Sequence, residues 1–93
     1  MTTIYKYELE LTPNTEQVLR LPRNAPVLSV GKQNDELYVW AKVNTEEVNI
    51  PRKFIVAWTG KELPESIAAK HSSAVFYGTV QIDYLVYHIF EVH

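Results

Sequence analysis

The sequence predicts an all-β protein: a small antiparallel sandwich or open barrel of about six to seven strands, with at most one short helix. Three observations support this fold class. Several short segments alternate between apolar and polar residues, as strands with one buried face do. Turn signals separate these segments at intervals of about ten residues. Most connections are too short for a crossover helix, so neighbouring strands should be antiparallel.

Length and composition bound the class of protein. The 93 residues predict a single domain, residues 1–93, without an internal repeat or linker. The absence of cysteine excludes disulfides, thiolate zinc sites and cysteine nucleophiles. A net charge of −2 argues against nonspecific nucleic-acid binding as the main role. Neither a secretory signal nor a membrane-spanning run is visible, so we expect a soluble intracellular protein with no membrane partner.

The clearest strand covers residues 2–11, where tyrosines and leucines share one side and charged residues the other. A turn at residues 12–15 follows, because Pro and Asn favour turn dihedrals. Asn34-Asp35 is a two-residue hairpin turn, since both residues tolerate positive φ. Further strands are expected over residues 17–21, 26–33, 36–43 and 52–59.

The last third of the chain is organised differently. Residues 61–73 are the only segment with helical character, with Pro64 in the first turn; the segment is at most two turns and otherwise a loop. Residues 74–93 form a closing hairpin that folds back near Gln81–Asp83. Its second strand is apolar on both faces, so it should lie centrally or be covered by another chain. Gly78 within this hairpin indicates a bulge or a close backbone approach.

The catalytic inventory is thin, and we expect no enzymatic activity, no metal site and no cofactor. The histidines lack the HxH and HExxH spacings that would place two imidazoles on one metal. No serine stands in a nucleophile elbow and no glycine-rich loop is present. His88, next to Tyr87 in an apolar run, is either a packing histidine with one satisfied nitrogen or a ligand-facing or protonatable group at an interface. Tyr87 is a further candidate for contact with a ligand or partner.

The better binding candidate is the outward side of the 36–43 strand. Tyr38, Trp40 and Lys42 stand in line there, about 7 Å apart. Such a stripe could stack a ring and neutralise a phosphate, form the centre of a protein interface, or cover a second small core under a loop. A second cluster, Arg52 and Lys53, is either a solvated basic edge or an anion clamp.

Short motifs follow one another over nearly the whole chain. They are Ile4-Tyr5-Lys6-Tyr7, Leu19-Arg20-Leu21-Pro22, Val27-Leu28-Ser29-Val30, Gln33-Asn34, Trp40-Ala41, Arg52-Lys53-Phe54, Thr59-Gly60, Leu63-Pro64, Tyr77-Gly78-Thr79 and Val86-Tyr87-His88-Ile89-Phe90-Glu91. In their order and spacing the chain resembles a family of short, uncharacterised bacteriophage and prophage proteins, classed as a domain of unknown function. Asp35 stands where members tend to have a glycine. The resemblance brings no catalytic residues and implies a phage accessory protein in the host bacterial cytoplasm.

These observations lead us to expect a non-enzymatic, homo-oligomeric binding protein. It would associate through the 74–93 hairpin and counteract a bacterial defence by sequestering a small anionic, nucleotide-like signalling ligand. The alternatives are an inhibitor that docks directly on a host protein and a minor virion or assembly component. A concave pocket around Trp40 would favour the small ligand, and a flat exposed patch would favour a protein partner.

Overall fold

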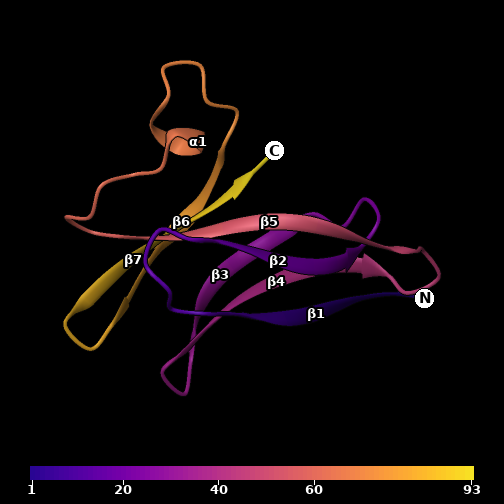
Figure 1. Ribbon diagram of the computed structural model, residues 1–93. Helices are drawn as coiled ribbons and strands as arrows, with labels where there is room; N and C mark the ends of the chain where they lie inside the picture. The colour runs from indigo at the N-terminus through magenta and orange to yellow at the C-terminus, as the bar shows by residue number, and fades with distance from the viewer.

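The computed structural model describes residues 1–93 and contains two antiparallel sheets (Figure 1). One sheet has the strand order β1-β4-β3, and the other has the order β2-β5-β7-β6. The sheets do not close into a barrel, so the predicted all-β class is confirmed in its sandwich form. The elements are β1 (Thr2–Leu9), β2 (Glu16–Pro22), β3 (Val27–Gln33), β4 (Glu36–Asn44), β5 (Asn49–Trp58), α1 (Glu65–Ala68), β6 (Val75–Ile82) and β7 (Leu85–Val92).

The element boundaries follow the sequence pattern with two instructive exceptions. The hairpin turn at Asn34-Asp35 is confirmed, with φ values of 53° and 62°. The expectation that the fifth strand begins at Arg52 was wrong, because β5 begins at Asn49 and includes Pro51. Pro51 pairs with β2, whereas pairing of β5 with β7 begins only at Lys53. No residue of β7 therefore stands opposite Pro51, and the N–H that proline lacks is not needed for a hydrogen bond to β7.

The segment with helical character forms a single turn, α1, for which Pro64 is the N-cap residue rather than a residue of the first turn. The final hairpin reverses at residues 83–84, with Ile82 opposite Leu85, so the reversal expected near Gln81–Asp83 is confirmed to within one residue. No helix of the chain has the length and apolar character needed to cross a bilayer.

The hydrophobic core lies between the two sheets. β4 shows how the alternating pattern produces it: its inner residues are buried, while its outer residues are half-buried or exposed. The main cluster draws on β1, β4, β5, β6 and β7 and consists of Leu9, Leu37, Val39, Phe54, Val56, Val80, Ile82, Tyr87 and Ile89. A smaller cluster beside it contains Leu21, Ala25, Ala41 and Val43.

The two sheets approach each other where β3 meets β6. The ladder between β6 and β7 is irregular between Phe76 and Gly78, and Gly78 has φ +156°. A Cβ atom at Gly78 would lie 2.8 Å from Cγ2 of Val30. The bulge and the close approach expected at Gly78 are therefore both confirmed.

β7 is central in its sheet, between β5 and β6, as its apolar character predicts. Tyr87 and Ile89 point into the core. The opposite face is partly covered by the chain's own excursion, residues 59–74, which carries α1 (Figure 1). Leu63 of this excursion lines one depression together with His88 and Phe90. Self-association through the 74–93 hairpin stays a prediction, because the chain itself explains part of the second apolar face.

Candidate binding surfaces

The outward side of the β1-β4-β3 sheet carries a group of basic and aromatic side chains, Lys6, Tyr38, Trp40 and Lys42, which we call the outer aromatic face. Lys6 stands directly opposite Trp40 in the β1–β4 ladder. The rings of Tyr38 and Trp40 are 5.8 Å apart between centroids. Lys6 Nζ lies 4.6 Å from the centroid of the Tyr38 ring, within the range of a cation–π contact. The outward direction expected for Tyr38, Trp40 and Lys42 is confirmed.

Hydrogen bonds hold this face in one arrangement. The Tyr38 hydroxyl donates to Glu36 over 2.6 Å, and Lys6 Nζ donates to Gln33 Oε1 over 2.6 Å. The hydrogen bond to Glu36, then burial and the charges of Glu36 and Glu8, raise the pKa of Tyr38 to about 12. Lys6 thus reaches from β1 across β4 to β3, so its ammonium lies over the sheet rather than beyond its edge.

Trp40 is half-buried because its indole packs over Gly31 of the neighbouring strand β3, which has no side chain at that position. Its Cζ3 atom lies 3.6 Å from the position that a Cβ on Gly31 would occupy. The indole therefore rests on the β3 backbone and keeps part of its surface exposed. None of the four depressions on the molecule is lined by Tyr38 or Trp40, so no pocket opens beside these two side chains. Lys42 lines a separate, polar depression of about 320 Å³.

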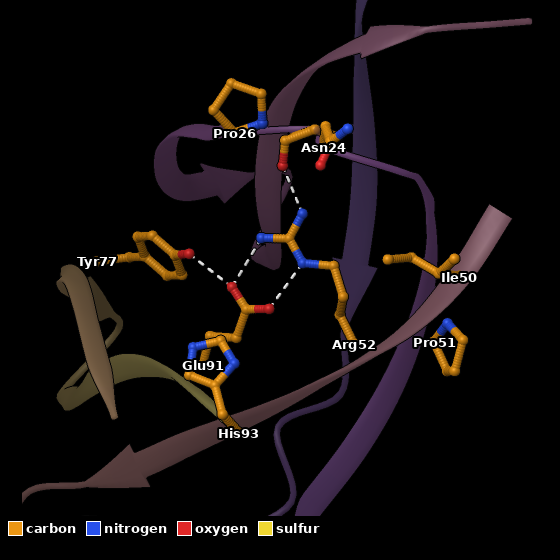
Figure 2. Close-up of a pocket in the computed structure, with 9 residues that line it drawn as sticks. Asn24, Pro26, Ile50, Pro51, Arg52, Tyr77, Glu91 and His93 are labelled. Carbon is orange, nitrogen blue, oxygen red and sulfur yellow. Dashed lines mark hydrogen bonds and ion pairs between the residues drawn. The ribbon is translucent and has the colours of Figure 1, made fainter. Parts of the chain in front are cut away.

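Arg52 and Glu91 form a buried ion pair at one end of the sandwich (Figure 2). Arg52 donates from Nε to Glu91 Oε2 and from Nη2 to Glu91 Oε1, both over 2.7 Å, and from Nη1 to the carbonyl of Ala25. The Tyr77 hydroxyl donates to the same carboxylate over 2.6 Å. The side chains of Arg52 and Glu91 are only 16 % and 4 % exposed. This network joins β5, β6, β7 and the β2–β3 connection.

Burial and hydrogen bonding compete in setting the pKa values of this network. Burial opposes the charged form of Glu91, but hydrogen bonds from Arg52 and Tyr77 outweigh it and hold the pKa of Glu91 below its ordinary value. The bond to Glu91 raises the pKa of Arg52, with burial acting in the opposite direction. Burial, and then the bond to Glu91, raise the pKa of Tyr77 to about 12.

The network borders an open depression of about 580 Å³, which Asn24, Pro26 and His93 also line (Figure 2). A guanidinium has five N–H groups, of which three are used here, so two N–H groups of Arg52 remain for a ligand. The forked side of the guanidinium is already occupied by Glu91. A ligand in the depression could therefore accept hydrogen bonds from Arg52, whose positive charge is already compensated by Glu91.

The structure does not bring all the candidate residues together. Lys53 points away from Arg52, to the outside of its sheet, where it lies 3.9 Å from Glu16. Tyr87 is part of the core and packs edge-to-face on Trp58, with ring centroids 5.4 Å apart. Tyr38, Trp40 and Lys42 lie on the opposite sheet from Lys53 and His88. The seven candidates thus belong to several separate places on the molecule.

His88 lies half-buried on the outer side of β7 with both ring nitrogens bonded. Its Nε2 is 2.7 Å from Thr59 Oγ1, and its Nδ1 is 2.9 Å from Thr79 Oγ1. Thr59 Oγ1 also donates to the carbonyl of Val86, which lets it accept from Nε2–H while Nδ1 accepts from Thr79. The imidazole therefore bridges Thr59 and Thr79 at one side of a depression of about 330 Å³.

A family model described as "Domain of unknown function (DUF7352)" matches residues 1–93. The chain belongs to this family. No curated protein and no solved structure matches the chain. Membership in DUF7352 therefore assigns no activity to the chain. Any inference about function rests on the residues themselves.

Sequence reasoning missed two members of the buried network of this DUF7352 domain, Glu91 and Tyr77. One signal was present: Glu91 has the same parity as Tyr87 and Ile89, so it continues the core-facing side of the last strand. A carboxylate on that side needs a cationic partner, and Arg52 shares the inner side of β5 with Phe54. Among the described residues, no group of three or more potential metal ligands comes together.

Proposed function

We propose that this chain is a non-enzymatic binding protein that docks on another protein through the outer aromatic face. The observation that carries the proposal is a half-exposed Trp40 on a face where no pocket opens beside it. Patches with an aromatic centre and basic neighbours are typical of protein interfaces, where Trp, Tyr and basic residues contribute most of the binding energy. Lys6 and Lys42 flank Trp40 and favour a partner with acidic side chains around an apolar centre.

The arrangement also reduces the cost of binding. The side chains of Lys6 and Tyr38 are already held by hydrogen bonds to Gln33 and Glu36, so less rotamer freedom is lost when a partner covers them. Trp40 is supported from below by the backbone at Gly31. A preorganised aromatic centre of this kind supports slow dissociation rather than a transient encounter.

The test compares bait variants that differ only on this face. Wild-type protein, Trp40→Ala and Lys6→Glu are immobilised and exposed to bacterial lysate, and captured proteins are quantified by mass spectrometry. We expect one partner to be retained by wild type and lost by both variants, with reconstitution from purified components. Tyr84→Ala is the matched control, because Tyr84 is a 98 % exposed aromatic residue in the turn between β6 and β7, which belong to the other sheet.

Circular dichroism and urea unfolding accompany the capture experiment, because Trp40 also rests on β3. Trp40→Ala should keep the fold, since the side chain points outward. Capture that is equal for wild type, Trp40→Ala and Lys6→Glu would overturn the proposal. Capture that fails only for variants with lost strand content would assign Trp40 a structural role instead.

The phage context implied by the sequence resemblance supports a host defence protein as the partner. Under this proposal the chain acts in the bacterial cytoplasm and blocks a defence system. Plaque counts on bacteria that carry individual defence systems, with and without the expressed chain, test this setting. We expect plaque numbers to rise in one strain with wild type and Tyr84→Ala but not with Trp40→Ala. Detection of the chain in purified phage particles would favour the virion-component alternative.

A second candidate, sequestration of a small nucleotide-like ligand, is favoured by the depression beside His88. Its volume of about 330 Å³ and its wall of Trp58, Leu63 and Phe90 suit a flat ring, and Lys61 supplies a cation for an anionic group. Calorimetric titration with cyclic and linear nucleotides tests it. Binding should be lost in Lys61→Glu and kept in Lys70→Glu, a control with the same charge change in the same excursion. No binding heat for any nucleotide would remove this candidate.

A further inference from the structure

The four outer strands of the two sheets differ in how they are protected against pairing with another chain. β2 ends at Pro22, which discourages edge pairing. β3 and β6 each have an irregular ladder, and they face each other across the contact between Val30 and Gly78. β1 has none of these features: its eight residues pair regularly with β4, without a bulge or a proline.

The free edge of β1 presents a regular row of backbone groups. The amide of Thr45 donates to the carbonyl of Met1 over 2.9 Å, so residue 1 directs its backbone groups toward β4. Since these directions alternate along an antiparallel strand, odd residues of β1 bond to β4 and even residues face away from it. The even residues are Thr2, Ile4, Lys6 and Glu8. Each of them offers one N–H and one C=O to a further strand.

The side chains leave this edge open as well. A lysine in the middle of an edge strand normally guards it, but Lys6 lies over Tyr38 and bonds to Gln33 on the far strand of the sheet. Ile4 and Tyr5 remain 56 % and 46 % exposed, although Tyr5 is on the core side of the sheet. An added strand would cover both.

We propose that β1 pairs antiparallel with β1 of a second copy of the chain, with Tyr5 opposite Tyr5. This register places Thr2 opposite Glu8 and Ile4 opposite Lys6, so that all the free N–H and C=O groups of the four even residues are bonded. It is the register that uses the whole edge. Moving the strands by one two-residue step leaves one even residue of each copy unpaired, and in one direction it also sets Lys6 against Lys6, which is unfavourable.

The pairing has a consequence for the outer surface. Three strands from each copy make one continuous six-stranded sheet, and the two-fold axis keeps the outward sides of both copies on the same side. The two outer aromatic faces then form one extended surface. The dimer follows from the edge of β1 alone and does not depend on what that surface binds.

Because the chain has no cysteine, a single introduced cysteine reports the register. Tyr5→Cys places two thiols in a non-hydrogen-bonded pair, where a Cα separation of about 4.5 Å lies within disulfide range. We expect Tyr5→Cys to form a covalent dimer under mild oxidation. Tyr7→Cys, which faces Thr3 of the second copy, is the matched control and should cross-link at least roughly tenfold more slowly, because the two cysteines lie four residues apart along the paired strands. Faster cross-linking of Tyr7→Cys, or none for Tyr5→Cys, would overturn the register.

Ile4→Pro tests the dimer itself. It removes a free-edge N–H and leaves the bonds to β4 in place. Multi-angle light scattering should give about twice the 10.8 kDa of one chain for wild type and Ile4→Thr. Ile4→Pro should weaken the dimer by roughly tenfold or more, because the symmetric pair loses a bond in each half. A wild-type mass of 10.8 kDa at high micromolar concentration would overturn the proposal. So would a dimer that cross-links through Phe76→Cys of the last hairpin and is unaffected by Ile4→Pro.

Discussion

At the scale of single residues, the most consequential side chain is Glu91, the one buried charged residue of the chain. A carboxylate in this position is stable only because Arg52 and Tyr77 supply three hydrogen bonds to it. The pair therefore fixes how β5, β6 and β7 meet at one end of the sandwich. It also limits what the adjoining depression can bind, because the fork of Arg52 is not free.

Glu91→Ala should destabilise the protein by about 3–5 kcal/mol, because it leaves the guanidinium of Arg52 buried without its counter-charge. The double substitution Arg52→Met/Glu91→Leu should cost much less than either single change, since it removes both charges and fills the space. Urea unfolding of wild type, Arg52→Met, Glu91→Leu and the double variant measures the coupling. A double variant that costs as much as the two single changes added together would show that the two charges are not coupled.

The pH dependence of stability follows from the same network. The folded-state pKa of Glu91 lies below its ordinary value of 4.5, so its contribution is present above about pH 4.5 and is lost as pH falls through the folded-state pKa. The pKa of Tyr77 is raised to about 12 from 10.0, so its contribution is present below pH 10 and is lost as pH rises toward 12. Unfolding curves of Glu91→Gln and Tyr77→Phe should lack the acid and alkaline losses respectively. A wild-type and a Glu91→Gln curve that fall in parallel below pH 4.5 would contradict this assignment.

The ion pair illustrates what sequence reasoning could not reach at this scale. Arg52 and Glu91 are 39 positions apart, and their contact depends on the pairing of β5 with β7, in which Phe54 is opposite Glu91. The alternation along a strand identifies the face of the sheet on which each side chain lies, but it does not identify the residue of another strand that the side chain contacts. The outward direction of Tyr38 and Trp40, by contrast, follows from parity alone and was predicted correctly.

At the scale of elements, the alternation of apolar and polar residues was enough to place β1, β4 and the turn between β3 and β4. It did not place the start of β5, because a proline such as Pro51 ends a strand only where its missing N–H would have to bond to a paired strand. Which strands are paired at Pro51 cannot be read from the alternation. Gly78 was interpreted correctly as a bulge, although the sequence does not say that Val30 is the side chain it must avoid.

Gly78→Ala should destabilise the fold by about 1–3 kcal/mol, through overpacking against Val30 and through its positive φ. Val30→Ala in the Gly78→Ala background should recover part of that loss, because it removes the clash and leaves only the backbone strain. Urea unfolding of both single variants and the double variant separates the two contributions. No recovery in the double variant would assign the whole cost to the backbone.

At the scale of the whole molecule, the excursion of residues 59–74 covers part of the outer side of the four-stranded sheet. It is anchored by Asn14, whose Oδ1 accepts from the Trp58 amide over 2.9 Å and whose Nδ2 donates to the Glu62 carbonyl. Leu63 then lies near His88 and Phe90 on the outer side of β7. Exposed apolar residues remain nearby, among them Phe76.

Replacing residues 61–73 by a short Gly-Ser linker should therefore expose the outer side of β7 and turn the last hairpin into a self-associating surface. We expect stronger binding of a hydrophobic dye and a larger mass by light scattering than for wild type, with the strand signal in circular dichroism retained. The variant Phe76→Lys in the same background should reverse the association, because it places a charge in the middle of the exposed patch. If the linker variant keeps the wild-type mass and dye binding, then the excursion does not shield β7. A wild-type hairpin that is already covered by a second copy would give that result.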